Sequence, residues 1–246
     1  KKLTPCGPLL SLFIVFLEPL RFSLLMFCSA KDFLYMVELR TFTILDKLQP
    51  QLASFLATIS QGYLPIEQQA SLYIEVAPGM AIQKVTDIAL KATDVRPGMQ
   101  IVERAYGVLE VHSDSMGMVQ QASDAILKHL NLKITDRLQP KIVSTQVITG
   151  VSPYQCQMIN RMRHGEMLYE GQTLYILETH PAGYALIAAN EAEKAASIKL
   201  LEVRAVGAFG RLYLGGEESE IEEAVKTILH TLGRIEGREN KEIREK

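Results

Sequence analysis

The 246-residue sequence predicts an α/β fold (an α+β sandwich) in which one unit, an antiparallel or mixed sheet covered by helices, occurs twice along the chain. Three observations predict it. Hydrophobic residues make up 48% of the chain and are mostly aliphatic, because aromatic residues make up only 7% and tryptophan is absent. The length suits one large domain or two of about one hundred residues each. A pattern of strands and helices in the first half recurs in the second half.

The internal repeat rests on short segments that match at a nearly constant spacing. The tripeptide LYI at Leu72–Ile74 recurs at Leu174–Ile176, and each copy precedes an acidic residue, a proline-containing turn and a helix. With one residue inserted after this match, the spacing becomes 103 and holds through the following helix and strands. The later matches pair Ala89, Lys91, Ala92, Ala105, Gly107 and Leu109 with Ala192, Lys194, Ala195, Ala208, Gly210 and Leu212. The two copies are therefore expected to span residues 36–137 and 138–236.

The hydrophobic pattern predicts the first elements of each copy. Each begins with a strand, a turn and a short helix, in residues 36–60 and 140–162. In the first copy, residues 71–77 should form a strand, because β-branched and aromatic side chains stand between polar boundaries. Apolar residues then recur at three- and four-residue steps over 81–94, which predicts an amphipathic helix. Residues 96–98, Arg-Pro-Gly, should break that helix.

Two strands and a final helix complete each copy. Residues 99–112 predict two strands with an interruption at Ala105–Gly107. Asp114 or Ser115 can cap the final helix of the first copy. In the second copy the final helix starts with Glu217, Glu218 and Glu220, which suit the positive end of a helix dipole. We interpret this acidic run as helix capping rather than as a metal site.

Residues 1–35 differ from the rest of the chain, because the stretch 8–28 is strongly apolar and follows two lysines. A membrane span needs about 20 consecutive apolar residues, and Glu18, Pro19 and Arg21 interrupt this stretch. A secretory signal peptide would need a small-x-small cleavage site, which is not evident. We favour a third interpretation, upstream sequence translated before a start at Met36, over a targeting or anchoring segment or a folded element.

Charge and cysteine content exclude several classes of function. The net charge is −2 and the pI is about 6.3, so no large basic field exists to neutralise nucleic-acid phosphates. Residues 1–35 hold four basic and two acidic side chains, and without them the net charge is −4. The remainder has one cysteine, Cys156, which suits a reducing cytosol. Its predicted helix favours a small buried side chain over a nucleophile.

The sequence lacks the common catalytic and metal-binding motifs. Its histidines, at positions 112, 129, 164, 180 and 230, include no pair at metal-ligand spacing on one predicted face. A P-loop, a GxSxG turn and the dinucleotide-binding glycine pattern are absent. Glu191 and Glu193 share a helix with Lys194, which is typical of a solvated face. We therefore expect no enzymatic activity, no cofactor and no metal.

The order helix, strand, turn, strand, helix resembles the ferredoxin-like bacterial microcompartment shell domain, in the segments DIALKA, VERAYGVLEVH and SMGMVQQASDAIL. Because the extra elements of each copy precede this core, the chain resembles the circularly permuted tandem form. More narrowly, ALKATDVRPGMQIVERAYG, ANEAEKAA and VRAVGAFGRLYLGG resemble the tandem-domain carboxysome shell proteins of cyanobacteria. The similarity covers residues 36 to about 233. Residues 1–35 and the charged tail, 237–246, have no counterpart in it.

The resemblance implies a structural protein of the carboxysome shell in the bacterial cytoplasm, serving carbon dioxide fixation. Family members form trimers that imitate a hexamer, and the loop between the two core strands of each domain faces the threefold axis. The family's acid and base at the pore match Glu103 and Arg104, which are implied to gate a pore for anionic, phosphorylated metabolites. The residues implied to line the pore are Ala105, Tyr106, Gly107, Val206, Gly207, Ala208 and Phe209.

The resemblance also implies other carboxysome shell proteins as partners, with one trimer or two stacked trimers as the unit, and neither nucleic acid nor membrane. Two alternatives stay open. From the residues alone, Glu103 and Arg104 also suit a surface ion pair worth about 0–1 kcal/mol. The fold also suits a trimeric ferredoxin-like sensor that binds a small anion between subunits and does not tile.

Overall fold

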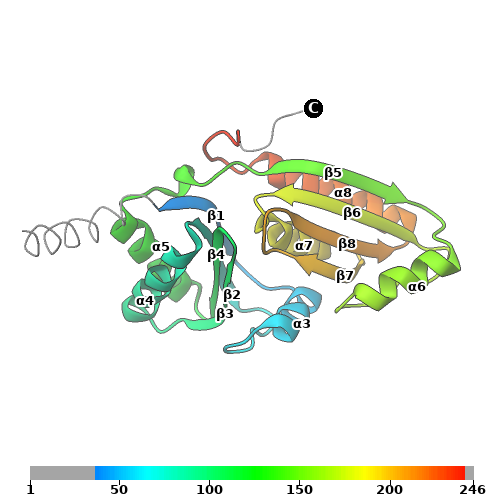
Figure 1. The fold of residues 1–246 in the computed structure, drawn as a ribbon. Coiled ribbons are helices and arrows are strands. Elements are labelled where there is room, and N and C mark those ends of the chain that lie inside the picture. The colour runs from blue at the N-terminus through cyan, green and yellow to red at the C-terminus, as the bar shows by residue number, and fades with distance from the viewer. Residues whose placement is uncertain (1–36, 242–246) are drawn as a thin grey trace, which may run out of the picture. The chain divides into compact units, whose positions relative to one another are not determined.

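The computed structural model describes residues 37–241, and its two sheets belong to one compact unit that begins at Glu38. Each sheet has four strands, in the orders β1-β2-β4-β3 and β5-β6-β8-β7 (Figure 1). Neighbouring strands are antiparallel throughout both sheets. The predicted fold class, a sheet-and-helix sandwich present twice, is confirmed.

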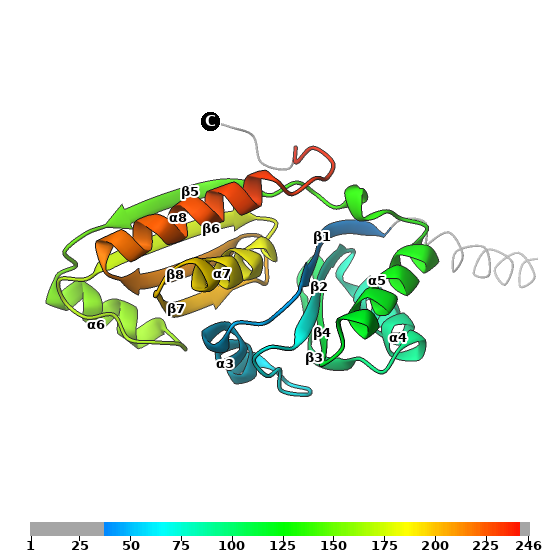
Figure 2. The ribbon, with the colours of Figure 1, turned by 180° about the vertical axis from the view of Figure 1, so that it is seen from behind.

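Each repeat consists of four strands and three α-helices in the same order. The first repeat contains β1 (Glu38–Leu45), α3 (Pro50–Ile59), β2 (Ala70–Ala77), α4 (Ile82–Ala92), β3 (Arg96–Glu103), β4 (Tyr106–Ser113) and α5 (Met116–Leu130). The second contains β5 (Lys141–Ile148), α6 (Pro153–Met162), β6 (Thr173–His180), α7 (Tyr184–Ala195), β7 (Lys199–Arg204), β8 (Gly210–Gly216) and α8 (Glu218–Gly233). The helices α4 and α5 pack on the first sheet, and α7 and α8 on the second (Figure 2). The domain boundaries at 36, 137 and 236 stay predictions.

An offset of 103 residues relates the two repeats from β1 through β4, and it becomes 102 in the final helices, which start at Met116 and Glu218. The strands β1 and β5 start 103 residues apart, and so do β2 and β6. The cross-strand pairs agree, because Ile74 faces Leu109 and Leu177 faces Leu212. The inserted residue expected from the two LYI segments is therefore wrong, and those segments are one position out of register. Because side chains alternate along a strand, a slip of one residue would exchange the two faces of the sheet.

Two turn predictions also need correction. Residues 96–98, predicted to break a helix, instead start β3, which bulges between Pro97 and Met99. The helix α4 has already ended at Ala92. The interruption between β3 and β4 is Arg104–Ala105 rather than Ala105–Gly107, because Tyr106 already pairs with Glu103.

The final helices α5 and α8 begin where the sequence predicted, but neither N-cap side chain forms a capping hydrogen bond. Ser115 is the N-cap residue of α5, yet its side chain makes no capping hydrogen bond. Glu217 is the N-cap residue of α8, and Glu218 and Glu220 lie in its first turn. These acidic groups stabilise the positive end of the helix, as expected. The Glu220 carboxylate also accepts a 2.7 Å hydrogen bond from the Ser197 amide before β7.

One hydrophobic core extends across both repeats. It contains Leu52 and Phe55 of α3 together with Tyr184 and Ala189 of α7. The helix α3 makes this core continuous, because it packs against α7 and β7 of the second repeat. Burial of its apolar side chains on the other repeat is therefore the main hydrophobic contribution to the joint between the repeats.

Polar contacts fix α3 in that position. Gln51 and Leu52, in the first turn of α3, donate their amides to the two carboxylate oxygens of Glu193 at 2.7 and 3.1 Å. The Gln49 amide donates to the Asn190 side chain at 3.1 Å. The solvated face predicted for Glu193 is therefore wrong: burial raises the pKa of its carboxyl, and the two backbone donors act in the opposite direction. Glu193 caps a helix of the other repeat.

The beginning of the predicted charged tail lies against the segment that joins the repeats. The Arg238 amide donates to the Arg137 carbonyl at 2.8 Å, and the Gln139 amide donates to the Arg238 carbonyl at 2.9 Å. Glycine is required at 237, because a Cβ there would lie 2.4 Å from the Arg137 carbonyl oxygen. These two hydrogen bonds hold Arg238 against the segment that joins the repeats.

The interpretations of residues 1–35 and of a start at Met36 concern residues outside the described range. Between Val37 and Lys241, no helix combines the length and the hydropathy that crossing a bilayer requires.

Removing the Glu193 cap should destabilise the joint between the repeats. We expect Glu193→Ala to lower the free energy of unfolding by about 1 kcal/mol, the usual effect of losing a helix cap. Glu191→Ala is the matched control, because Glu191 lies on the same helix but pairs with Lys194 of that helix. Urea unfolding of both variants measures the difference, and equal midpoints would contradict the capping role.

Candidate functional site

The candidate site consists of the two loops that join the last two strands of each sheet. Loop 1 is defined as residues 103–107, from the last residue of β3 to the second residue of β4, and loop 2 as the equivalent residues 206–210, which end at the first residue of β8. The offset of 103 residues makes them equivalent. Glu103, Arg104 and Ala105 are exposed in loop 1, and Ala208 and Phe209 are exposed in loop 2. Short connections of this kind hold their side chains at the rim of a rigid sheet.

Both loops contain a residue with a positive φ at the equivalent position. Arg104 has φ +53° and Gly207 has φ +102°. Glycine adopts such angles without penalty, whereas an L-residue in the left-handed region costs roughly 1–2 kcal/mol. The first repeat therefore keeps an arginine where the turn favours glycine. Such backbone strain in a folded protein is concentrated at functional positions.

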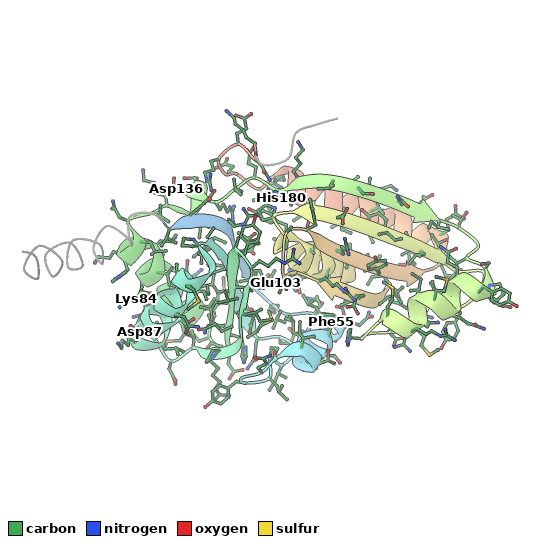
Figure 3. The ribbon with its side chains drawn as sticks, viewed as in Figure 1. Phe55, Lys84, Asp87, Glu103, Asp136 and His180 are labelled. Carbon is green, nitrogen blue, oxygen red and sulfur yellow. The ribbon has the colours of Figure 1, made fainter. Side chains whose placement is uncertain are left out.

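Glu103 reaches from loop 1 toward loop 2. A Cβ built on Gly207 would lie 3.7 Å from the Glu103 Oε1 atom. In Figure 3 the Glu103 side chain lies between the two sheets. Among the residues that the structure describes, no ion pair joins Glu103 to Arg104. The carboxylate and the guanidinium of loop 1 are thus both presented outward instead of neutralising each other within the chain.

A cleft of about 450 Å³ lies beside the loops, bounded by Glu103, most of loop 2, α3 and β7. Apart from Glu103, its charged groups form pairs of their own. Arg204 lies 3.3 Å from one Glu202 oxygen, and His164 Nδ1 lies 2.8 Å from the other. Arg211 donates to Glu178 at 2.9 Å. The cleft therefore combines largely apolar walls with a few charged side chains, most of which are paired.

The glycines at the second end of each loop serve packing within each repeat. A Cβ on Gly107 would lie 2.1 Å from the Gly79 carbonyl oxygen. A Cβ on Gly210 would lie 2.2 Å from the carbonyl oxygen of Ala182, the residue equivalent to Gly79. Both glycines are buried and let each loop descend closely onto the turn before α4 or α7.

The structure adds two residues, Arg40 and His180, that the sequence analysis did not select for the site. Arg40 of β1 stacks over the Tyr106 ring, with 3.7 Å from its guanidinium carbon to the ring centroid. The His180 ring of β6 contacts the Phe209 ring at a centroid distance of 5.8 Å. The sequence signal that could have identified them is the comparison of the two repeats, because Val143 and Ala77 stand at the positions equivalent to Arg40 and His180.

Cys156 lies in α6 and is buried, as predicted. Burial raises the pKa of its thiol, which keeps the sulfur protonated and weakens it as a nucleophile. Within residues 37–241, no three His, Cys, Asp or Glu side chains are grouped so that they could hold a metal ion.

Comparison with known proteins identifies the family. The family model for the CsoS1D N-terminal domain matches residues 39–136. Carboxysome shell protein CcmP of Synechococcus elongatus is 50% identical over 204 residues, which cover 83% of this chain and 96% of that protein. Carboxysome shell protein CsoS1D of Hydrogenovibrio crunogenus is 50% identical over 201 residues, covering 81% and 98%. This chain belongs to the tandem-domain microcompartment shell proteins.

Solved structures of tandem-domain shell proteins have the same fold. A fused permuted hexameric shell protein from the RMM microcompartment gives a TM-score of 0.80 at 41% identity, over 82% of this chain and 99% of that one. A double-ringed trimeric shell protein from the same microcompartment gives 0.80 at 39% identity, over 83% and 100%. The resemblance inferred from the sequence motifs is confirmed, including the permuted tandem arrangement. The relatives bear the names of structural shell proteins.

The strained turns of this shell protein allow a direct test. We expect Gly207→Ala to lower the free energy of unfolding by roughly 1–2 kcal/mol, because alanine resists a φ of +102°. Gly117→Ala is the control: Gly117 lies in α5 with room for a methyl group, so alanine should stabilise the chain by roughly 0.5–1 kcal/mol. Thermal unfolding distinguishes them, and equal effects of the two substitutions would contradict the backbone argument.

Proposed function

We propose that this chain is a structural tile of a carboxysome shell, located in the bacterial cytoplasm, that assembles as a trimer around a gated central pore. Homology to CcmP and CsoS1D, which are named as carboxysome shell proteins, supports the location and a non-enzymatic role. The observation that carries the assembly is the joint between the two repeats. The equivalent surfaces of the two repeats, formed by α4 and β3 and by β5 and α6, carry exposed side chains that complement each other.

The internal joint provides the template for the contact between chains. In it, β1 and α3 of the first repeat pack on α7 and β7 of the second. By the offset of 103 residues, β5 and α6 are equivalent to β1 and α3, while α4 and β3 are equivalent to α7 and β7. One chain would therefore place its β5 and α6 against α4 and β3 of the next chain.

These outer surfaces are apolar where the internal joint is polar. Tyr154 of α6 is 80% exposed and stands at the position equivalent to Gln51. Leu90 of α4 is 43% exposed and stands at the position equivalent to Glu193. Superposing the outer contact on the internal joint brings Tyr154 onto Leu90. Burial of such side chains is the usual driving force for stable association.

The sizes of the side chains also complement one another. In the internal joint, Tyr73 packs so closely on Gly183 that a Cβ there would lie 2.5 Å from its ring. The equivalent residues on the outer surfaces are the smaller Ile176 and the larger Met80, which is 64% exposed. A large residue opposite a small one is thus replaced by the reverse arrangement. This preserves the volume that a close-packed contact requires.

Repeating one head-to-tail contact closes a ring when the rotation allows it. Six equivalent units from three chains would form such a ring, and solved relatives described as hexameric and trimeric support it. One relative is described as double-ringed, which supports stacking of two trimers. Other shell proteins would surround the ring in a carboxysome. Family membership favours this tile over a sensor that does not assemble into sheets.

The loops around the axis would form the gate. Glu103 and Arg104 are exposed and unpaired with each other within the described chain, so each can pair across subunits. Converging arginines repel one another unless carboxylates neutralise them. A ring of Glu103–Arg104 pairs would close the pore, and separation of the pairs would open it. Open arginines would favour anions such as phosphorylated metabolites, which match guanidinium geometry. The lining would come from residues 105–107 and 206–209.

Tyr154→Glu should prevent trimer formation, because the outer contact would then bury an unpaired carboxylate. Light scattering coupled to size-exclusion chromatography should give the mass of one chain for this variant and three times that mass, or a multiple of it, for the parent. Leu229→Glu on α8 is the control, since Leu229 is 41% exposed outside these surfaces. A monomeric parent, or a trimeric Tyr154→Glu variant, would contradict the proposed contact.

The double variant Glu103→Ala with Arg104→Ala should change metabolite exchange while trimers persist. The exposed Glu223 and Lys226 pair of α8, truncated to alanine in the same way, is the charge-matched control. Carbon fixation in cells whose carboxysomes carry each variant measures exchange. Carbon fixation unchanged in the loop variant would count against the gate, whereas a change shared with the control would indicate a general charge effect.

A further inference from the structure

The two loops are connected within the chain through a buried pair of side chains. Arg40 is 1% exposed, and one of its terminal nitrogens donates to His180 Nε2 at 3.0 Å. Arg40 belongs to the first repeat and His180 to the second. In Figure 3, His180 lies at the boundary of the two sheets, close to the region of Glu103. The hydrogen bond therefore crosses the joint between the repeats.

Each member of this pair holds an aromatic side chain from one loop. The Arg40 guanidinium stacks on Tyr106 of loop 1 at 3.7 Å, within the range of a favourable cation–π contact. The His180 ring packs on Phe209 of loop 2 at 5.8 Å. Tyr106 and Phe209 are equivalent residues, 103 positions apart. A chain of direct contacts thus runs from Tyr106 through Arg40 and His180 to Phe209.

A carboxylate beneath the pair fixes the guanidinium. Arg40 Nε donates to Glu75 Oε1 at 2.9 Å. The Thr41 hydroxyl and the Gly183 amide each donate to Glu75 Oε2 at 3.2 Å, and Gly183 belongs to the second repeat. Tyr73 also donates its hydroxyl to the carbonyl of Ala205, the residue directly before loop 2. The support for the pair is itself shared between the repeats.

The pair has no equivalent elsewhere in the described chain. Val143 stands at the position equivalent to Arg40, and Ala77 stands at the position equivalent to His180. Neither of these side chains can form such a hydrogen bond. The outer contact between chains, built from the equivalent surfaces, would therefore lack this connection. Loops of the same chain are connected, whereas loops of neighbouring chains are not.

We propose that Arg40 and His180 are positioning residues that couple the two loops of one chain, so that displacement of one loop is transmitted to the other. The consequence for a pore rests on the proposed function: a ring of three chains would move its loops as three pairs rather than as six independent gates. The coupling itself is a property of the single chain.

Hydrogen exchange of the full chain, followed by mass spectrometry, tests the coupling without any transport measurement. The reporters are the amides at the start of β4 for loop 1 and at the start of β8 for loop 2. Tyr106→Leu removes the cation–π contact in loop 1 and should accelerate exchange at the start of β8 by about threefold or more. Tyr106→Phe retains the aromatic face and should leave both reporters at the parental rate.

His180→Gln interrupts the connection conservatively. A glutamine oxygen can still accept the Arg40 hydrogen bond, but the ring that contacts Phe209 is lost. In that background, Tyr106→Leu should have no further effect at β8. An unchanged β8 reporter in Tyr106→Leu alone, or the same acceleration with and without His180→Gln, would overturn the proposal, because a merely structural role for His180 predicts independent effects.

Global unfolding would accelerate exchange in the central strand β2 as well, so that strand is the internal reference. If Tyr106→Leu unfolds the chain, Phe209→Leu tests the same coupling in the opposite direction, because coupling between sites is reciprocal. It should then accelerate exchange at β4, and an unchanged β4 reporter would overturn the proposal. Failure of the coupling and failure of the proposed gate are distinguishable. Hydrogen exchange reports whether the two loops are coupled, and carbon fixation in the Glu103 and Arg104 variant reports whether the pore is gated.

Discussion

The approach of Gly183 to Tyr73 is the constraint on which the arrangement of the two repeats depends. A side chain at 183 would collide with the Tyr73 ring, so only glycine permits this distance. At this distance the Gly183 amide reaches the Glu75 carboxylate, and the Tyr73 hydroxyl reaches the Ala205 carbonyl. Since Ala205 directly precedes loop 2, the same contact fixes where that loop starts.

The difference between the internal joint and its outer equivalents has a physical reason. Two repeats on one chain meet at a high effective concentration, so the rim of their joint can use polar contacts such as the Glu193 cap beside the shared hydrophobic core. Two separate chains lose translational and rotational freedom when they associate, and burial of apolar side chains is the main term that offsets this loss. Gln51 paired with Glu193 inside the chain, and the exposed Tyr154 and Leu90 of the proposed contact between chains, agree with that distinction. The two repeats share the same arrangement of strands and helices, and they differ in a few side chains on the surfaces that the internal joint and the proposed contact use.

The sequence predicted the elements better than their contacts. Local signals depend only on neighbours along the chain. The β-branched and aromatic residues of β2 and the three- and four-residue period of α4 therefore made these elements predictable, as was the helix that contains Cys156. The LYI segments misled by one position because a three-residue match in apolar strands carries little information about register. Glu193 and Arg40 find their partners more than one hundred residues away. No local pattern specifies such partners, although a polar residue in one copy opposite an apolar residue in the other, as for Arg40 and Val143, marks where the copies diverge.

The same comparison between copies explains why Arg104 bears strain. Gly207 shows which residue the turn itself favours, so the arginine at the equivalent position is retained against a backbone penalty of roughly 1–2 kcal/mol. The surrounding structure must therefore hold loop 1 firmly, and Tyr106, two residues later, is held by the Arg40 guanidinium. Arg40 in turn is anchored by a buried carboxylate and by the second repeat. Removing that support would let the strained turn relax. The positive φ of Arg104 and the Arg40 contact with Tyr106 thus lie two residues apart in the same short loop, where a held aromatic side chain restricts the backbone beside the strained residue.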